Sequence, residues 1–137
     1  MRVLIDSNVI LDALMTREPW AEQAEGILLA SAEEKLAGYI TASMVTDIYY
    51  IIHKHLRSRE QSKMALVKLL AILDVLEVNG SDCEKALESE LSDYEDAVLV
   101  TCAKRHKIDF IVTRNMKDFN KSPVDALTPN DLLKKID

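Results

Sequence analysis

The stretch Arg2-Val3-Leu4-Ile5-Asp6-Ser7-Asn8 decides the fold of this chain. Its apolar residues predict a short buried strand at 3–5, and the polar triplet that follows ends the strand. The apolar spacing at 8–15 then indicates a helix, with Asn8 at its start as a good N-cap residue. A buried strand that runs directly into a helix opens a strand–helix–strand unit, which is typical of a parallel sheet.

Strands and helices alternate along the rest of the sequence. Apolar runs predict further strands at 36–41, 75–78, 110–113 and 125–127, the last of which is weak. Helical spacing predicts helices at 19–30, 43–56, 60–73, 81–90, 92–106 and from 129 onward. This order indicates an α/β fold with a central, mostly parallel sheet.

Several helix starts depend on capping signals. Pro19 suits a first helical turn, and Ser43 can cap the helix at 43–56. Ser92 and Glu95 have the spacing of a capping box. These signals set the expected helix boundaries.

The size and composition of the chain predict one domain that spans residues 1–137. The chain has 137 residues, of which 48% are hydrophobic, and no repeat or linker divides it. No apolar run approaches the length of a membrane span, and a strand from residue 2 leaves no room for a signal peptide. We therefore expect a cytoplasmic protein with no membrane partner. Cys83 and Cys102 have no metal-ligand spacing and are expected to be reduced thiols.

Acidic and basic residues are unevenly distributed along the sequence, and this distribution bears on whether the protein binds nucleic acid. The net charge of −6 argues at first against a nucleic-acid partner. Acidic residues dominate 1–52 and 81–103, whereas basic residues dominate 53–80 and 104–137. A bound cation would offset the acidic blocks, and the basic blocks could border them. This asymmetry is a weak signal for a phosphate ligand.

Five aspartates stand at the ends of apolar segments or beside them: Asp6, Asp47, Asp93, Asp96 and Asp118. Sites in parallel sheets form outside the carboxyl ends of the strands, so we expect these carboxylates to meet at one edge. Carboxylates gathered in this way repel one another, and a divalent cation is the usual remedy. Oxygen-only ligands favour Mg²⁺ or Mn²⁺, and such a site suits cleavage of a phosphodiester by metal-bound water.

Each aspartate also has a purely structural explanation. Asp6 suits the end of a strand, and Asp47 borders an apolar helical arc, where a solvated carboxylate is ordinary. Capping of a first helical turn partly explains Asp93. It explains Asp96 less well, because Asp96 sits directly against the apolar run 97–103. Asp96 is therefore preferred to Asp93 as a ligand.

Polar and basic residues surround the expected site. Thr113 and Asn115 follow a strand, where they satisfy turn backbone groups or orient a ligand or water. Four basic residues are candidates to contact RNA: Arg114, Lys117, Lys104 and Arg105. For the last two, a position at a helix C-terminus is an ordinary alternative explanation.

Three of these blocks resemble the PIN-domain nuclease family. They are Val3-Leu4-Ile5-Asp6-Ser7-Asn8-Val9-Ile10-Leu11-Asp12, Asp93-Tyr94-Glu95-Asp96-Ala97 and Phe110-Ile111-Val112-Thr113-Arg114-Asn115-Met116-Lys117-Asp118-Phe119. Their order and spacing are similar to the family's across essentially the whole chain, and the size resembles that of the small prokaryotic VapC-type toxins. The resemblance implies a three-layer α/β/α fold and Mg²⁺- or Mn²⁺-dependent cleavage of single-stranded RNA.

The resemblance also implies roles and partners. The family's second acid is typically Glu and falls here on Asp47, whose shorter side chain requires a nearer metal or a bridging water. The other acidic and polar positions fall on Asp6, Asn8, Asp96, Thr113 and Asp118. VapC-type toxins are similar in being homodimers that a small antitoxin inhibits, which makes both partners an expectation for this chain.

The favoured hypothesis is therefore a metal-dependent endoribonuclease that needs no protein nucleophile. The alternative is a catalytically weak RNA- or protein-binding module on the same fold, supported by Asp47 and the acidic balance. A receiver-like signalling domain would need an aspartate at the end of the strand at 75–78, where none occurs. Apolar surface on the helix at 60–73 and at Tyr49-Tyr50 exceeds what the sheet readily covers and favours a dimer.

Overall fold

Five strands form one parallel sheet in the order β3-β2-β1-β4-β5. The computed structural model describes residues 1–136. The strands are β1 (Arg2–Ile5), β2 (Ala37–Thr41), β3 (Asp74–Leu76), β4 (Phe110–Val112) and β5 (Asp125–Leu127). Every one of them lies where the sequence predicts a strand.

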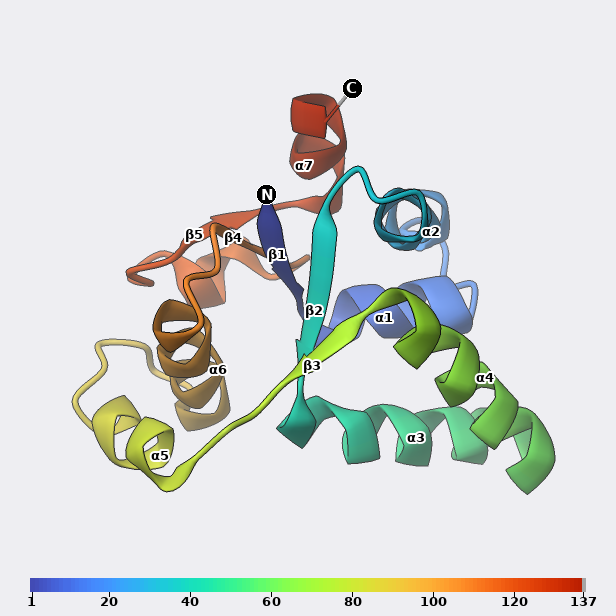
Figure 1. Cartoon of the computed structure of the whole chain (residues 1–137), viewed down its shortest axis with the longest axis horizontal. Helices are drawn as coiled ribbons and strands as arrows, with labels where there is room; N and C mark the ends of the chain where they lie inside the picture. The colour runs from blue at the N-terminus through green and yellow to red at the C-terminus, as the bar shows by residue number, and fades with distance from the viewer. Residues whose placement is uncertain (137) are drawn as a thin grey trace.

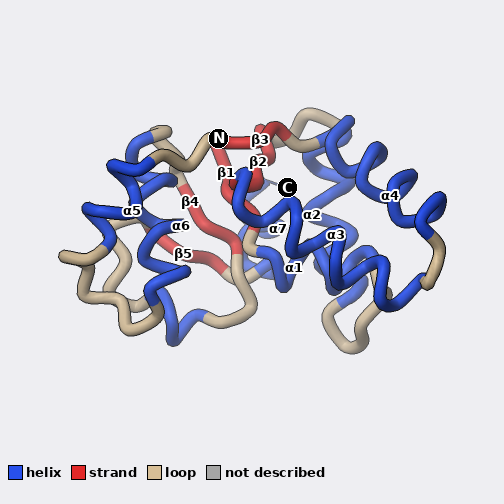
Figure 2. The backbone as a smooth tube through the Cα atoms, turned by 90° about the horizontal axis from the view of Figure 1, so that it is seen from below, coloured by secondary structure: helices blue, strands red, loops and turns tan. Residues whose placement is uncertain are grey.

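Helices cover both faces of the sheet, which confirms the three-layer α/β/α fold. They are α1 (Ser7–Leu14), α2 (Ala21–Ala32), α3 (Ala42–Leu56), α4 (Arg59–Ile72), α5 (Gly80–Ala86), α6 (Tyr94–Arg105) and α7 (Pro129–Ile136), with a 3₁₀ turn η1 (Met116–Phe119). Helices α1 to α4 lie on one side of the sheet and α5 and α6 on the other (Figures 1 and 2). Helix α7 packs against α2. Among residues 1–136, no helix is both long and apolar enough to cross a membrane.

The chain reverses its direction across the sheet at β1. It proceeds from β1 through β2 to β3, and then returns to place β4 on the other side of β1. Crossovers between parallel strands are right-handed, so a reversal of direction moves the following helices to the opposite face. The carboxyl ends of β1 and β4 therefore form a topological switch point, which is where open α/β sheets place their ligand sites.

Strand β1 is the buried centre of the sheet. Val3, Leu4 and Ile5 are fully buried, as are Ile111 and Val112 of β4. A strand with helices on both faces needs apolar side chains on both, which explains its continuous apolar run. Asp6, which follows this run directly, is also buried.

Two helix starts differ from the prediction because an aspartate caps each helix. Asp6, rather than Asn8, is the N-cap of α1, and its Oδ1 accepts the Ser7 N–H at 2.8 Å. Asp93 is the N-cap of α6, where its Oδ1 accepts two backbone N–H groups at 2.8 and 3.3 Å. The capping box predicted one residue earlier is therefore wrong.

Other helix ends also differ from the prediction. Helix α2 begins after Pro19 rather than at it. Ser43 lies inside α3, because the extended backbone of Thr41 already marks the start of that helix. Helix α5 ends earlier than expected, and it is capped by the side chain of Asn79 in a capping box.

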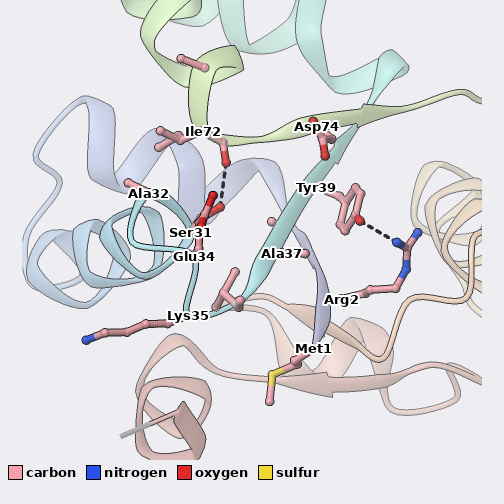
Figure 3. Close-up of a pocket in the computed structure, with 13 residues that line it drawn as sticks. Met1, Arg2, Ser31, Ala32, Glu34, Lys35, Ala37, Tyr39, Ile72 and Asp74 are labelled. Carbon is pink, nitrogen blue, oxygen red and sulfur yellow. Dashed lines mark hydrogen bonds between the residues drawn. The ribbon is translucent and has the colours of Figure 1, made fainter.

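The amino-terminal edge of the sheet contains a cavity of about 500 Å³ (Figure 3). On one side of it, Arg2 Nη1 donates a hydrogen bond to the Tyr39 hydroxyl at 2.6 Å. On another, Ser31 Oγ donates to the Ile72 carbonyl at 2.8 Å. This cavity lies at the edge opposite to the carboxyl ends of the strands, so it is separate from the aspartates.

Gly38 of β2 is expected to be intolerant of a side chain. A Cβ at this position would lie 2.6 Å from both Leu73 Cδ2 and Ser31 Oγ. We expect Gly38→Ala to lower the free energy of unfolding by about 1–3 kcal/mol, measured by urea denaturation, because overpacking displaces buried neighbours. Gly80→Ala is the control, since a Cβ there meets nothing within 4 Å. Equal stability of the two variants would contradict the close approach.

Candidate metal centre

An acidic cleft of about 250 Å³ opens at the switch point. Its residues come from the ends of β1 and β2, the start of α6 and the loop after β4. The acidic members are Asp6, Asp93, Glu95, Asp96 and Asp118, and the neutral polar members include Asn8, Thr41, Ser43 and Asn115. The structure thus brings together four of the five aspartates singled out in the sequence.

Asp6 is the most constrained acid of the cleft. It is buried, and its Oδ2 accepts hydrogen bonds from Thr113 Oγ1 at 2.8 Å and from Asn8 Nδ2 at 3.3 Å. Burial raises the pKa of Asp6 above its ordinary value, although the hydrogen bonds from Thr113 and from the Ser7 N–H partly oppose that rise. Thr113 is itself fully buried, so both members of the pair are fixed.

The pKa of Asp96 reflects the negative charges that surround it. Burial, followed by the negative charges of Asp93, Asp6 and Asp118, raises the pKa of Asp96 to about 7. Like charges that share one site disfavour ionisation in this way. A cation in the cleft would remove the cause of the repulsion.

The donor set of the cleft fits a hard divalent cation. All the candidate ligands are oxygens, as Mg²⁺ and Mn²⁺ prefer. Asn8 Oδ1 is buried and has no hydrogen-bond partner, although Asn8 Nδ2 is engaged with Asp6. A buried acceptor without a partner is costly, so a water or a cation is the natural occupant beside it. Within residues 1–136, no three acidic, histidine or cysteine side chains are close enough to hold one ion together.

Asp47 stays outside the cleft. Ser43 and Met44 of α3 line it, but Asp47, one turn further along the helix, is exposed. A side chain four residues after Ser43 lies on the same face of the helix, so Asp47 stands beyond the rim of the cleft. Its position as a ligand remains a prediction.

Arg114 is not free to bind a phosphate in the way that the sequence predicts. Its Nε and Nη2 donate to the two carboxylate oxygens of Asp12, at 2.8 and 3.2 Å. Its guanidinium lies over the Trp20 ring, 3.9 Å from the ring centroid. Arg17 Nε lies 3.2 Å from the same carboxylate, without a hydrogen bond. Two basic side chains are therefore committed to one buried acid.

Sequence reasoning missed Asp12, which is only 1% exposed. The available signal was an aspartate within the apolar run of a short helix, between Leu11 and Ala13. A carboxylate in that position must find a cationic partner, because an unpaired buried charge is very unfavourable. The partner comes from the loop after β4, far away in the sequence.

The other basic candidates have different environments. Arg105 forms a forked pair with the fully buried Asp82, with both hydrogen bonds at 2.9 Å, so it stabilises the contact between α5 and α6. Lys104 is exposed, but it lies about 12 Å along α6 from Asp96, at 1.5 Å per residue. Lys117 is exposed in η1, next to Asp118. Of the four, Lys117 is nearest in the chain to a cleft acid.

The PIN-domain family model matches residues 2–117. No curated protein matches the sequence. A solved toxin–antitoxin complex from Klebsiella pneumoniae is 22% identical, with a TM-score of 0.69, over 93% of this chain and 97% of that chain. VapBC2 from Rickettsia felis, bound to a DNA fragment from their promoter, is 18% identical, with a TM-score of 0.69, over 93% and 98%.

A third solved structure is VapC20 from Mycobacterium tuberculosis, described as a sarcin-ricin loop cleaving toxin. It is 13% identical, with a TM-score of 0.58, over 80% of this chain and 86% of that chain. At these identities, each structure shows a likeness of fold alone.

The metal-free protein should become less stable as the pH rises from about 4 to about 7. The raised pKa of Asp96 means that the folded state holds a proton that the unfolded state releases near pH 4, and this advantage is lost through the folded pKa of about 7. At about pH 8 in EDTA, we expect Asp96→Asn to be more stable than the parent by ~1 kcal/mol, allowing for solvent screening. The difference should vanish near pH 4. If Asp96→Asn and the parent had equal melting temperatures at both pH values, repulsion between Asp96 and the other carboxylates of the cleft would be contradicted.

Proposed function

The chain belongs to the PIN-domain family of nucleases, and we propose that it is a metal-dependent endoribonuclease that cleaves single-stranded RNA. The observation that carries the proposal is the convergence of Asp6, Asp96 and Asp118 on one cleft at the switch point of the sheet. A cluster of acids repels RNA phosphates, so a cleft of this kind suits the reaction only with a cation bound.

We assign the ligands by their position in the cleft. Asp6, Asp96 and Asp118 would hold Mg²⁺ or Mn²⁺ in part through water, because no three acidic side chains within residues 1–136 are close enough to hold one ion directly, and Asp93 lies beside them. Asp47, which stands beyond the rim of the cleft, would reach the ion through a water. When bound, a divalent cation neutralises the carboxylates and activates water for attack on phosphorus.

Neutral residues of the chain orient the acids. Thr113 Oγ1 donates to Asp6 and also accepts the Asn115 N–H at 3.1 Å, so it connects β1 to the loop that leads to Asp118. Asn8 Nδ2 donates to the same Asp6 oxygen, which leaves Asn8 Oδ1 available for a water. These contacts fix the direction of one carboxylate before any ligand arrives.

The RNA substrate and the protein partners are inferred from the relatives. VapC20 is described as cleaving the sarcin-ricin loop, and the Klebsiella structure is a toxin–antitoxin complex. We therefore propose that this chain is a toxin with a small antitoxin partner. A homodimer agrees with the exposed apolar side chains Tyr50, Met64 and Val67 of α3 and α4, and a monomeric mass by light scattering would exclude it.

The proposal is tested with end-labelled single-stranded RNA in Mn²⁺ or Mg²⁺. We expect cleavage that EDTA abolishes. In Asp118→Asn, kcat/KM should fall by more than about 100-fold, which is more than is usual when a residue that only hydrogen-bonds to a metal ligand is replaced. Asp74→Asn is the control, because Asp74 is an exposed aspartate at the start of β3, on the opposite edge of the sheet. RNA binding without cleavage under any metal would favour the alternative of a binding module.

The same assay decides the role of Asp47. If Asp47 reaches the cation through water, Asp47→Asn should slow cleavage and weaken Mn²⁺ binding while the fold survives, since the residue is exposed. Asp47→Glu restores the usual length of the family's second acid, so cleavage should be unchanged or faster. Parent-like rates and affinities in both variants would make Asp47 a solvated helix residue.

A further inference from the structure

Trp20 is the only tryptophan of the chain, and its side chain is 38% exposed. It lies just before α2, and the Arg114 guanidinium covers the ring at 3.9 Å from its centroid. Arg114 is adjacent in the chain to Thr113, which binds Asp6, and to Asn115, which lines the cleft. Arg114 therefore links the ring to the residues of the cleft.

The ring packs against Arg114, which forms an ion pair with Asp12. The two carboxylate oxygens of Asp12 receive Arg114 Nε and Nη2, so the plane of the guanidinium is fixed against the ring. Asp12 is 1% exposed, which makes this pair a rigid support. A fixed aromatic ring loses little conformational entropy when a ligand stacks on it.

Few basic side chains are available near the cleft to hold RNA phosphates. Lys117 is exposed beside Asp118, and stacking on an aromatic ring would add a second kind of contact. The cleft presents several carboxylates, and Arg114 and Arg105, which could have countered them, are paired with Asp12 and Asp82. Every nucleobase has an apolar π-face, so an exposed ring can bind a strand without using its phosphates.

A second hollow adjoins the acidic cleft. It has a volume of about 380 Å³, is lined by residues 114–118, and shares Asn115 and Asp118 with the acidic cleft. Arg114 forms part of its wall and supports Trp20. A strand that leaves the cleft along this hollow passes Arg114, the side chain that supports the ring.

We propose that Trp20, supported by Arg114, is a stacking platform for a base of the RNA strand that crosses the acidic cleft. The inference rests on the proposed function, because it takes single-stranded RNA as the ligand. It adds a binding position that is neither a metal ligand nor a phosphate contact. Binding there should depend weakly on salt, because few phosphate contacts release few counterions.

The test uses the fluorescence of Trp20, which reports on this position alone. A short labelled oligoadenylate is titrated into the full chain with Ca²⁺ present to neutralise the carboxylates, and a gel confirms that the strand stays intact. We expect quenching of the tryptophan emission that saturates together with the anisotropy of the strand. The same backbone without bases should bind poorly and leave the emission unchanged.

Variants separate stacking from a structural role of the ring. We expect Trp20→Ala to weaken binding by about 5- to 150-fold, the range for loss of one stacked base, and Trp20→Phe to retain most of the affinity. Leu87→Ala is the control, because Leu87 is an apolar side chain that is 75% exposed and lies outside the cleft, the hollow and the surface proposed for the dimer. Its affinity for the strand should equal that of the parent. Circular dichroism confirms that each variant is folded.

Several outcomes would overturn the platform. They are an absence of strand binding, binding without a change in emission, equal binding of the strand without bases, and parent-like affinity in Trp20→Ala. An emission shift that depends only on protein concentration would assign Trp20 to a protein contact instead. Quenching without Mn²⁺-dependent cleavage would reject the nuclease and keep the platform, whereas cleavage without quenching would reject the platform alone.

Discussion

The parallel pairing of β1 with β4 is the constraint on which the cleft depends. Its register sets Ile5 opposite Val112, so the residues that follow, Asp6 and Thr113, emerge side by side. The Asp6 N–H then continues the ladder to the Val112 carbonyl at 3.0 Å. A slip of one residue would reverse the direction of each side chain and separate the pair. Such a slip would also draw a polar or charged residue from one end of a run into the buried layers, which opposes it.

Much of this arrangement follows from local features of the sequence. Continuous apolar runs locate β1 and β4, because strands covered on both faces cannot alternate with polar residues, whereas the edge strands β3 and β5 are short and partly exposed. The aspartates at the ends of those runs could be collected into one cluster by the topology of parallel sheets alone. Helix starts were harder to predict, because Asp6, Asn8 and Ser7 are all acceptable caps and only the backbone decides among them.

Long-range pairing explains what the sequence could not show. Arg114 and Arg105 looked available for RNA because their neighbours in sequence are polar or basic. Their partners, Asp12 and Asp82, lie on other helices and are buried, so the pairing depends on how the helices pack. Asp47 illustrates the same limit, because helical spacing gives the face on which it lies but not the reach of its side chain to the cleft.

Asp6 and Asp93 each belong to the cleft and begin a helix. The amino ends of α1 and α6 therefore both face the cleft, and the positive ends of the two helix dipoles lower the electrostatic cost of gathering acids there. Mutational drift is constrained as a result. An apolar substitution at either position removes a helix cap as well as an oxygen of the cleft, so selection for folding alone would tend to preserve a polar capping residue at these two positions. In this part of the chain, stability and chemistry reinforce each other, in contrast to the trade-off often found at active sites.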